Sequence, residues 1–235
     1  MIVTRCFFSI KCYALIACCI TLFSLQGQVG KTLSQDTVRI EKRRFIAPIW
    51  TYQDMNRDIY GLALGFSSRN KLFNTRTNGV RIEAVGMGLF LAMLPSFPER
   101  EEEEFGEIMS AAPFQVINGV NLSPLGSLCG FDVNGISLGG WGQWMRSVNG
   151  VSASIAMNIV ERNNGVSLGA WNISTRTSGL QLGLIYNQAM VVHGIQIGSF
   201  NVAKKLKGFQ FGLWNVNQKR KLPLVNWAFD DNKSS

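Results

Sequence analysis

GIQIGSFNVAKKLKGFQFGLWNVN, residues 194–217, contains two copies of one short phrase, and that phrase decides the fold. Each copy starts on a glycine, alternates apolar residues with Gln or Gly, and then reaches an aromatic residue and an asparagine. Repetition at a nearly fixed spacing indicates a repeat architecture, so we expect function to be built on a repeated strand and not on a catalytic pocket. The copies start at Asn118-Gly119, Asn134-Gly135, Asn149-Gly150, Asn164-Gly165, Ser178-Gly179, His193-Gly194 and, in degenerate form, Lys207-Gly208.

The alternation within each copy predicts a β-strand, because successive side chains of a strand point to opposite faces. The clearest copies have apolar residues one, three and five positions after the glycine, with Gln at position two and Gly at position four. The middle copies replace this Gln with Ser. One face of each strand is therefore aliphatic, and the other carries Gln, Ser and Gly. Tyr60–Phe66 and Asn78–Phe90 are predicted to be two earlier strands of the same kind.

An aromatic residue six positions after the glycine falls on the polar face if the alternation continues. We expect these aromatic side chains to cover glycines of neighbouring strands, with a carbohydrate-stacking platform as the alternative. The residues of this candidate binding face are Trp141, Trp171, Phe200 and Trp214. An asparagine follows in several copies (Asn172, Asn201 and Asn215), and we expect it to end the strand before a loop of about six residues.

The chain divides into segments of different composition. Arg5, Lys11 and the apolar stretch 12–23 are typical of a signal peptide cleaved near Gly27, with a lipoprotein signal ending at Cys18 or a buried N-terminal helix as alternatives. The acidic run 99–104 predicts a solvated loop or short helix. The predicted organisation is a signal peptide at 1–27, an N-terminal extension at 28–58, one β-repeat domain at 59–229 with an acidic insertion at 95–113, and a polar tail at 230–235.

The residue inventory argues against an enzyme. Removal of residues 1–27 leaves Cys129 as the single cysteine and His193 as the single histidine, too few ligands for a zinc site. Two copies spell Gly-x-Ser-x-Gly, but the strand period already places Ser137 and Ser167 where other copies have Gln. Gly30-Lys31-Thr32 lacks the earlier glycine of a phosphate loop. We expect no catalytic residues, no cofactor and no metal.

The chain is basic, with a formal net charge of +8 that falls to +6 when Arg5 and Lys11 leave with the signal peptide. Such a charge suits an anionic surface, although solubility explains it equally well. The densest basic cluster is Lys204, Lys205, Lys207 and 219–221, which we interpret as a solvated edge or a contact to anionic envelope components. We do not expect nucleic acid to be a partner.

The phrase at 194–217, together with LPLVNW at 222–227 and NGVRIEAVGMGLF at 78–90, resembles the surface-repeat family of spirochaete and Bacteroidetes cell-envelope proteins. The resemblance covers residues 60–229. It implies an exported protein with no assigned activity and no catalytic residues to transfer. The chain departs from the family pattern by using Ser for Gln in the middle copies and by carrying a polar tail after Phe229.

Two all-β architectures are compatible with a repeat of 14 to 16 residues. We favour an antiparallel meander that closes into a barrel of about ten strands, with the aliphatic face outward and Gln, Ser and Gly inside. The alternative is a parallel β-solenoid in which the asparagines stack as a ladder and Ala203 and Leu206 return to the core.

Each architecture predicts its own function. The barrel implies a structural protein or narrow pore of the outer membrane. The solenoid implies a soluble surface adhesion or ligand-binding module. In both cases we expect a non-enzymatic, exported protein at the outer membrane or cell surface of a Gram-negative-type envelope, or in the periplasm. Its expected partners are the outer membrane or other envelope surface components.

Overall fold

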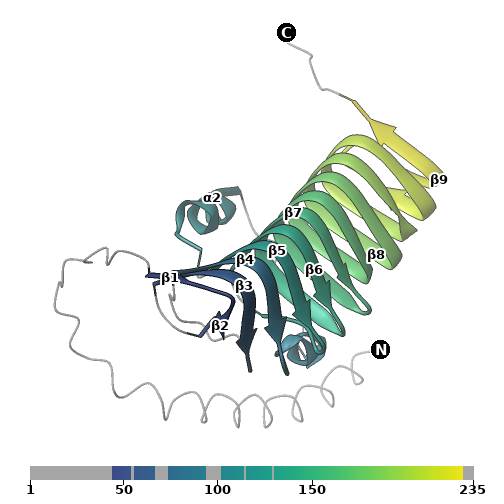
Figure 1. Cartoon of the computed structure of the whole chain (residues 1–235). Coiled ribbons are helices and arrows are strands. Elements are labelled where there is room, and N and C mark those ends of the chain that lie inside the picture. The colour runs from purple at the N-terminus through teal and green to yellow at the C-terminus, as the bar shows by residue number, and fades with distance from the viewer. Residues whose placement is uncertain are drawn as a thin grey trace, which may run out of the picture. The chain divides into compact units, whose positions relative to one another are not determined.

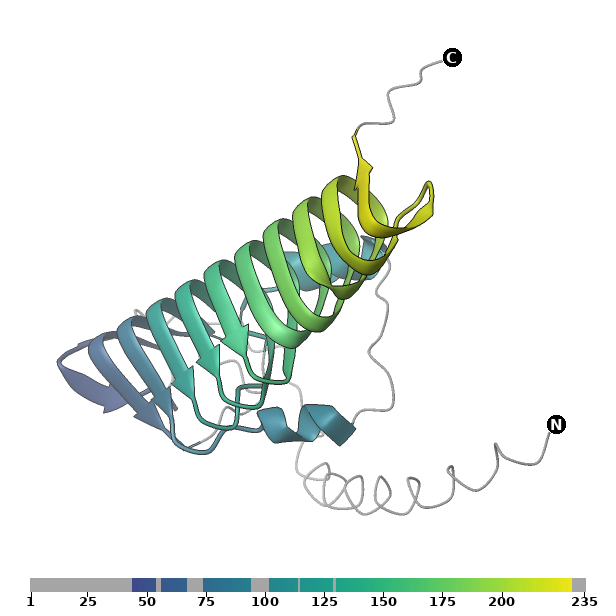
Figure 2. The ribbon, with the colours of Figure 1, turned by 90° about the vertical axis from the view of Figure 1, so that its right-hand side faces the viewer.

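The chain folds as a parallel β-solenoid, in which each sequence repeat forms one turn (Figures 1 and 2). The computed structural model describes residues 44–53, 56–66, 74–93, 102–113, 115–128 and 130–229. The strands are β1 (Arg44–Ile46), β2 (Ile49–Thr51), β3 (Arg57–Gly65), β4 (Thr75–Glu83), β5 (Gln115–Ser123), β6 (Asp132–Gly139), β7 (Gly142–Ser154), β8 (Met157–Val216) and β9 (Lys221–Ala228). The helices are η1 (Gly88–Met93) and α2 (Glu102–Ser110).

Equivalent residues of neighbouring repeats pair in parallel register. Gly61 pairs with Gly79, Gly119 with Gly135, and Gly150 with Gly165. All-β structure is thus confirmed, whereas the antiparallel barrel is wrong and the solenoid alternative is confirmed. The physical reason is that parallel register places each Gly, Gln or Asn on its own counterpart, so one residue type solves the same packing problem in every turn.

From β6 onward each turn contains two strands and not one strand with a loop. The first strand begins at the repeat glycine, and the second strand runs from the turn's closing corner to the residue before the next repeat glycine. The segments 159–164 and 173–178, predicted to be loops, lie within the continuous strand β8. Ile159 and Val160 are buried, so the first segment supplies apolar residues to the core. In the second segment Ser174 and Thr177 fill the inward positions. Ala203 and Leu206 are buried, as the solenoid alternative predicts.

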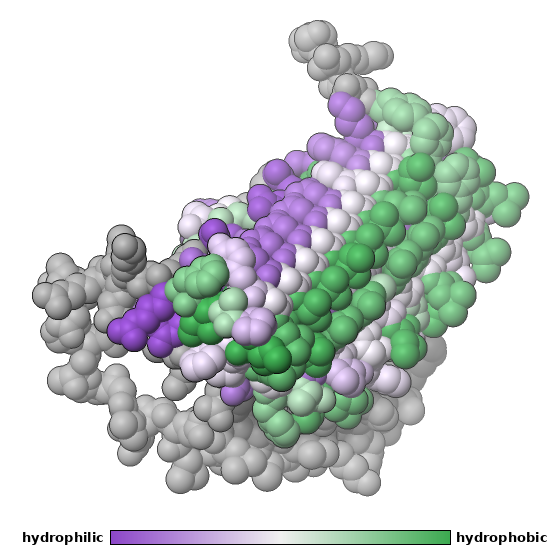
Figure 3. Space-filling view, viewed as in Figure 1, coloured by the Kyte–Doolittle hydropathy of each residue, from purple (hydrophilic) through white to green (hydrophobic). Residues whose placement is uncertain are grey.

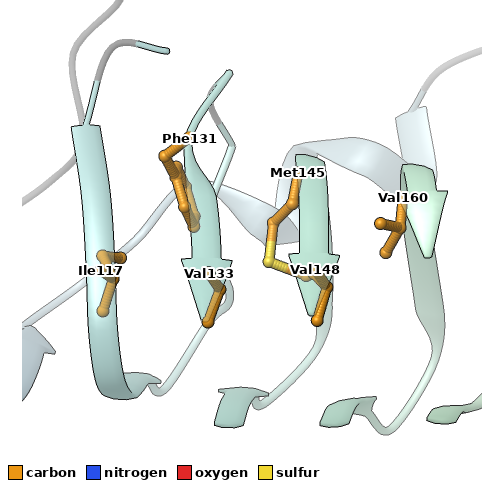
Figure 4. Packing of buried hydrophobic residues seen from close by; sticks show 6 residues of the cluster. All are labelled: Ile117, Phe131, Val133, Met145, Val148 and Val160. Carbon is orange, nitrogen blue, oxygen red and sulfur yellow. The ribbon is translucent and has the colours of Figure 1, made fainter. Parts of the chain in front are cut away.

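The second strand of each turn supplies the apolar half of the interior. Its inward side chains stack along the solenoid axis between neighbouring turns (Figure 4). One cluster contains Ile117, Phe131, Val133, Met145, Val148 and Val160, and a later one contains Ala189, Val192, Ala203, Leu206 and Ala228.

The first strand of each turn supplies the polar half of the interior. Gln196 donates from Nε2 to Gln181 Oε1 at 2.7 Å, and Gln210 donates to Gln196 Oε1 at 2.8 Å. The closing asparagines form a second ladder, in which Asn187 donates to Asn201 Oδ1 at 2.7 Å and Asn201 to Asn215 Oδ1 at 2.7 Å. These carboxamides are fully buried, and their hydrogen bonds offset the cost of removing them from water.

The two described ends of the solenoid differ. At the start, β1 and β2, which fall within the predicted N-terminal extension 28–58, both pair in parallel with β3. At the other end β9 runs antiparallel to the last turn of β8. Arg220 lies there with its guanidinium 4.2 Å from the centre of the Trp227 ring and its Nε 3.1 Å from Asn226 Oδ1. The antiparallel strand therefore ends the parallel stack.

The acidic insertion contains the short helix that was one of its two predicted forms. α2 starts within the acidic run, and its residues Glu103 and Glu104 are exposed. Its buried Phe105 faces the second strands of the solenoid, with the Arg176 guanidinium 5.1 Å from the ring centre. The predicted signal peptide 1–27, Gly30-Lys31-Thr32, Cys129 and the tail 230–235 lie outside the described residues.

Candidate docking surface

The first strands of the solenoid turn their aliphatic face outward, because their polar face lines the interior. Side chains one and three positions after each repeat glycine form what we call the outer apolar face. In Figure 3 this face is a continuous hydrophobic band along the solenoid. It includes Ile136, Leu138, Ile195, Ile197, Phe209 and Phe211, each exposed by more than a third. The prediction that one face is aliphatic and one polar is confirmed.

The outer apolar face is long and narrow. Neighbouring turns lie about 4.8 Å apart and a strand rises about 3.3 Å per residue, so positions one to three along the stack give a face of about 40 Å by 10 Å, or about 400 Å². The largest apolar patch on a typical monomeric protein is about 300–600 Å² and is often functional. The outer apolar face lies within this range and is therefore a candidate binding surface.

One corner of the solenoid extends the apolar surface. The chain bends at positions five and six after each glycine, and the aliphatic side chains there project from the molecule. Ile155 is 75% exposed and Leu184 is 78% exposed. Figure 3 shows hydrophobic groups protruding beyond the band.

The predicted aromatic residues also lie at this corner and not on the polar face. Trp141, Trp171, Phe200 and Trp214 are exposed, from 36% for Trp171 to 47% for Phe200. The prediction that these side chains cover glycines is therefore wrong. The corner interrupts the period-two alternation, so the next residue that points inward is the asparagine that follows the aromatic residue. The structure does bring the four into one row, which Ala156 interrupts between Trp141 and Trp171, and Ile185 between Trp171 and Phe200.

The opposite corner is hydrophilic. The residue before each repeat glycine is asparagine in five turns, and these side chains bond in sequence along the corner. Asn134 donates to Asn118 Oδ1 at 2.8 Å, and Asn149 donates to Asn134 Oδ1 at 2.7 Å. A hydrophilic stripe runs beside the apolar band in Figure 3. The outer apolar face thus has one apolar and one polar boundary.

The residues of the apparent hydrolase motif are not assembled into a site. Ser137 is fully buried and donates to Gln143 Oε1 at 2.8 Å. Ser167 is 2% exposed and donates to Asn172 Oδ1 at 3.0 Å. His193 directly precedes Gly194 and is exposed at the hydrophilic corner. The interior ladders explain why serine recurs at this position.

Other chemistry in the described ranges is limited. No group of three or more His, Cys, Asp or Glu residues that could hold a metal ion occurs there. A small cavity of about 140 Å³ lies between α2 and the second strands. It is lined by Phe105, Thr175, Arg176, Met190, Val191, Lys204 and Lys205. Neither described helix is long and apolar enough to cross a membrane.

Sequence reasoning identified the aromatic row but did not place the outer apolar face in a solenoid. A signal was available, because Gln recurs at one position and its amide can bond to its own counterpart in the next turn. Such a ladder places the polar side inside and the aliphatic side outside.

No known protein family, curated protein or solved structure matches this chain.

Proposed function

We propose that the protein is a non-enzymatic, exported β-solenoid of the cell envelope that attaches through its outer apolar face to the outer membrane or another envelope surface. The observation that supports this function is the outward direction of side chains such as Ile195 and Ile197, which most domains would bury. Each of these side chains is about 40% exposed, so burying the remainder against a surface provides about 0.6–1.2 kcal/mol each. Docking is therefore a source of free energy that the solenoid alone does not use.

The proposal predicts that polar substitutions on this face release the protein from the envelope. In cells producing the full chain, we expect the double variant Ile195→Asn/Ile197→Asn to raise the ratio of protein in the supernatant to protein in the pelleted envelope fraction at least tenfold. Each substitution removes an apolar side chain that is buried in the docked state. The measurement is the amount in each fraction, with and without detergent.

A matched control makes the same kind of change on the other outer side. Ile173 and Val202 are half-buried, and each lies between inward-pointing residues of a second strand. The variant Ile173→Asn/Val202→Asn should keep the protein in the pellet. Equal retention of both double variants would contradict the assignment of the outer apolar face.

The exposed aromatic row supports a second candidate function, adhesion to an envelope polysaccharide. Flat aromatic side chains such as Trp171 and Trp214 present apolar faces on which sugar rings can stack. Under this alternative, Trp171→Ala/Trp214→Ala would abolish retention on insoluble cell-wall material. Detergent would then leave the wild-type protein bound, which distinguishes adhesion from membrane attachment.

A further inference from the structure

The C-terminal third of the solenoid contains many more basic than acidic residues. Between residues 162 and 229 the sequence has no Asp or Glu. The same segment has eight basic residues: Arg162, Arg176, Lys204, Lys205, Lys207, Lys219, Arg220 and Lys221. Asp230 and Asp231 follow directly, so residues 162–231 contain six more basic than acidic residues.

The apolar surface is most aromatic at the same end. Val225 pairs with Phe211 and Trp227 with Phe209, which places the side chains of β9 beside those of the last turn of β8. The Phe209 ring lies 5.1 Å from the ring of Phe229. We call the following exposed residues the C-terminal apolar patch: Phe209, Phe211, Leu213, Trp214, Leu224, Val225, Trp227 and Phe229.

Two members of the patch project furthest. Leu213 is 65% exposed and Leu224 is 69% exposed. Both belong to the bend and edge of the last turn, where Leu224 pairs with Gly212. Their side chains can enter an apolar medium without any rearrangement of the strands.

Exposed lysines border the patch at both corners. Lys207 immediately precedes the repeat glycine Gly208, at the corner where the first strand begins. Lys221 pairs with Val216, beyond the corner formed by Leu213 and Trp214. The patch is therefore an apolar surface with cationic groups on two sides.

We propose that this patch docks into a membrane leaflet that contains anionic lipids. The proposal rests on the proposed function and specifies the chemistry of the surface to which the outer apolar face attaches. Leucine side chains enter the acyl region, tryptophans occupy the interface, and long lysine side chains reach the phosphates. Each lysine near an anionic membrane strengthens binding by about fivefold.

Charge favours a lipid surface over a second copy of the chain. Two C-terminal patches brought together would oppose two surfaces that both have an excess of basic residues. An anionic leaflet instead offers a phosphate to every exposed lysine, and it accommodates projecting side chains of different lengths.

The test uses the full chain and vesicles sedimented with the bound protein. One set contains phosphatidylcholine only, and the other contains equal amounts of phosphatidylcholine and phosphatidylglycerol. We expect binding to the anionic set that weakens as salt is added. The variant Lys207→Gln/Lys221→Gln should bind about 30-fold more weakly, and Leu213→Ser/Leu224→Ser should lose binding. Phe66→Ser, a change at an exposed residue of the opposite end, should bind normally.

The outcomes separate this proposal from the proposed function. Equal binding to both vesicle sets, or an unchanged affinity of the lysine variant, would overturn anionic-lipid recognition and leave envelope attachment standing. Absence of vesicle binding with detergent-dependent retention in cells would overturn the lipid and indicate a protein partner. Dimerisation that Leu213→Ser/Leu224→Ser abolishes would identify a second copy as the occupant. Absence of vesicle binding together with release from the cell envelope without detergent would overturn both proposals. Circular dichroism shows whether each variant keeps its β-sheet content.

Discussion

Gly150→Ala is expected to destabilise the solenoid by at least about 4 kcal/mol, a large part of the stability of an ordinary domain. Gly150 has a φ of +137°, in a region that is essentially restricted to glycine. A Cβ atom at this position would overlap the carbonyl oxygen of Gly135 in the preceding turn. That oxygen belongs to the backbone of the stack and cannot move alone, so the strain and the overlap add. The measurement is the urea midpoint of the full chain, followed by circular dichroism.

The matched control is the same substitution in α2. A Cβ atom added to Gly106 would meet nothing within 4 Å. Gly106→Ala should leave the stability unchanged or raise it by up to about 1 kcal/mol, because alanine is the better helix former. A midpoint for Gly150→Ala within the error of this control would show that the repeat glycines do not stack as described.

The stacking glycines were visible in the sequence as a spacing, but their conformation was not. The repeat and its alternation follow from the residue order alone, since the period of two is a property of any strand. Parallel and antiparallel pairing produce the same alternation. Only the identity of Gln181, Gln196 and Gln210 favours the parallel form, since a ladder requires each residue to meet its counterpart. The barrel prediction gave this identity too little weight.

The second strand was missed for a different reason. Its inward positions do not repeat one residue type, because Val160, Ser174 and Ala203 fill a space that also depends on the first strand opposite. A strand with such mixed inward residues resembles a loop when read alone. The same limit applies to the candidate site. The aromatic row was found by its spacing, but its exposure depends on a bend that alternation does not reveal.

The asparagine ladder leads to the second prediction. Asn201→Ala should reduce the free energy of unfolding by about 3 kcal/mol or more. Asn201 Nδ2 donates to Asn215 Oδ1 at 2.7 Å and to the Phe211 carbonyl at 2.9 Å, while its Oδ1 accepts from Asn187. Alanine removes the Asn201 carboxamide, so Asn215 Oδ1, the Phe211 carbonyl and the Asn187 amide each lose a hydrogen-bond partner. Each unsatisfied buried group costs about 1–3 kcal/mol. Urea unfolding of the full chain measures the loss.

The hydrophilic corner, where asparagines precede the repeat glycines, provides the control. Asn149 also bonds to asparagines in both neighbouring turns, at 2.7 Å and 2.8 Å, but its side chain is exposed. Water can replace those bonds, so Asn149→Ala should cost less than about 1 kcal/mol. Equal losses for Asn149→Ala and Asn201→Ala would contradict the buried position of the inner ladder.

A double substitution tests whether the inner ladder acts as a unit. Asn187 and Asn201 share one hydrogen bond, so removal of either already leaves the other with an unsatisfied group. The variant Asn187→Ala/Asn201→Ala should therefore lose less stability than the sum of the two single variants, by about 1 kcal/mol or more. Additive losses would mean that the turns are held by independent contacts. A ladder that acts as a unit explains why the chain keeps asparagine at this position while the length of the repeat varies around it.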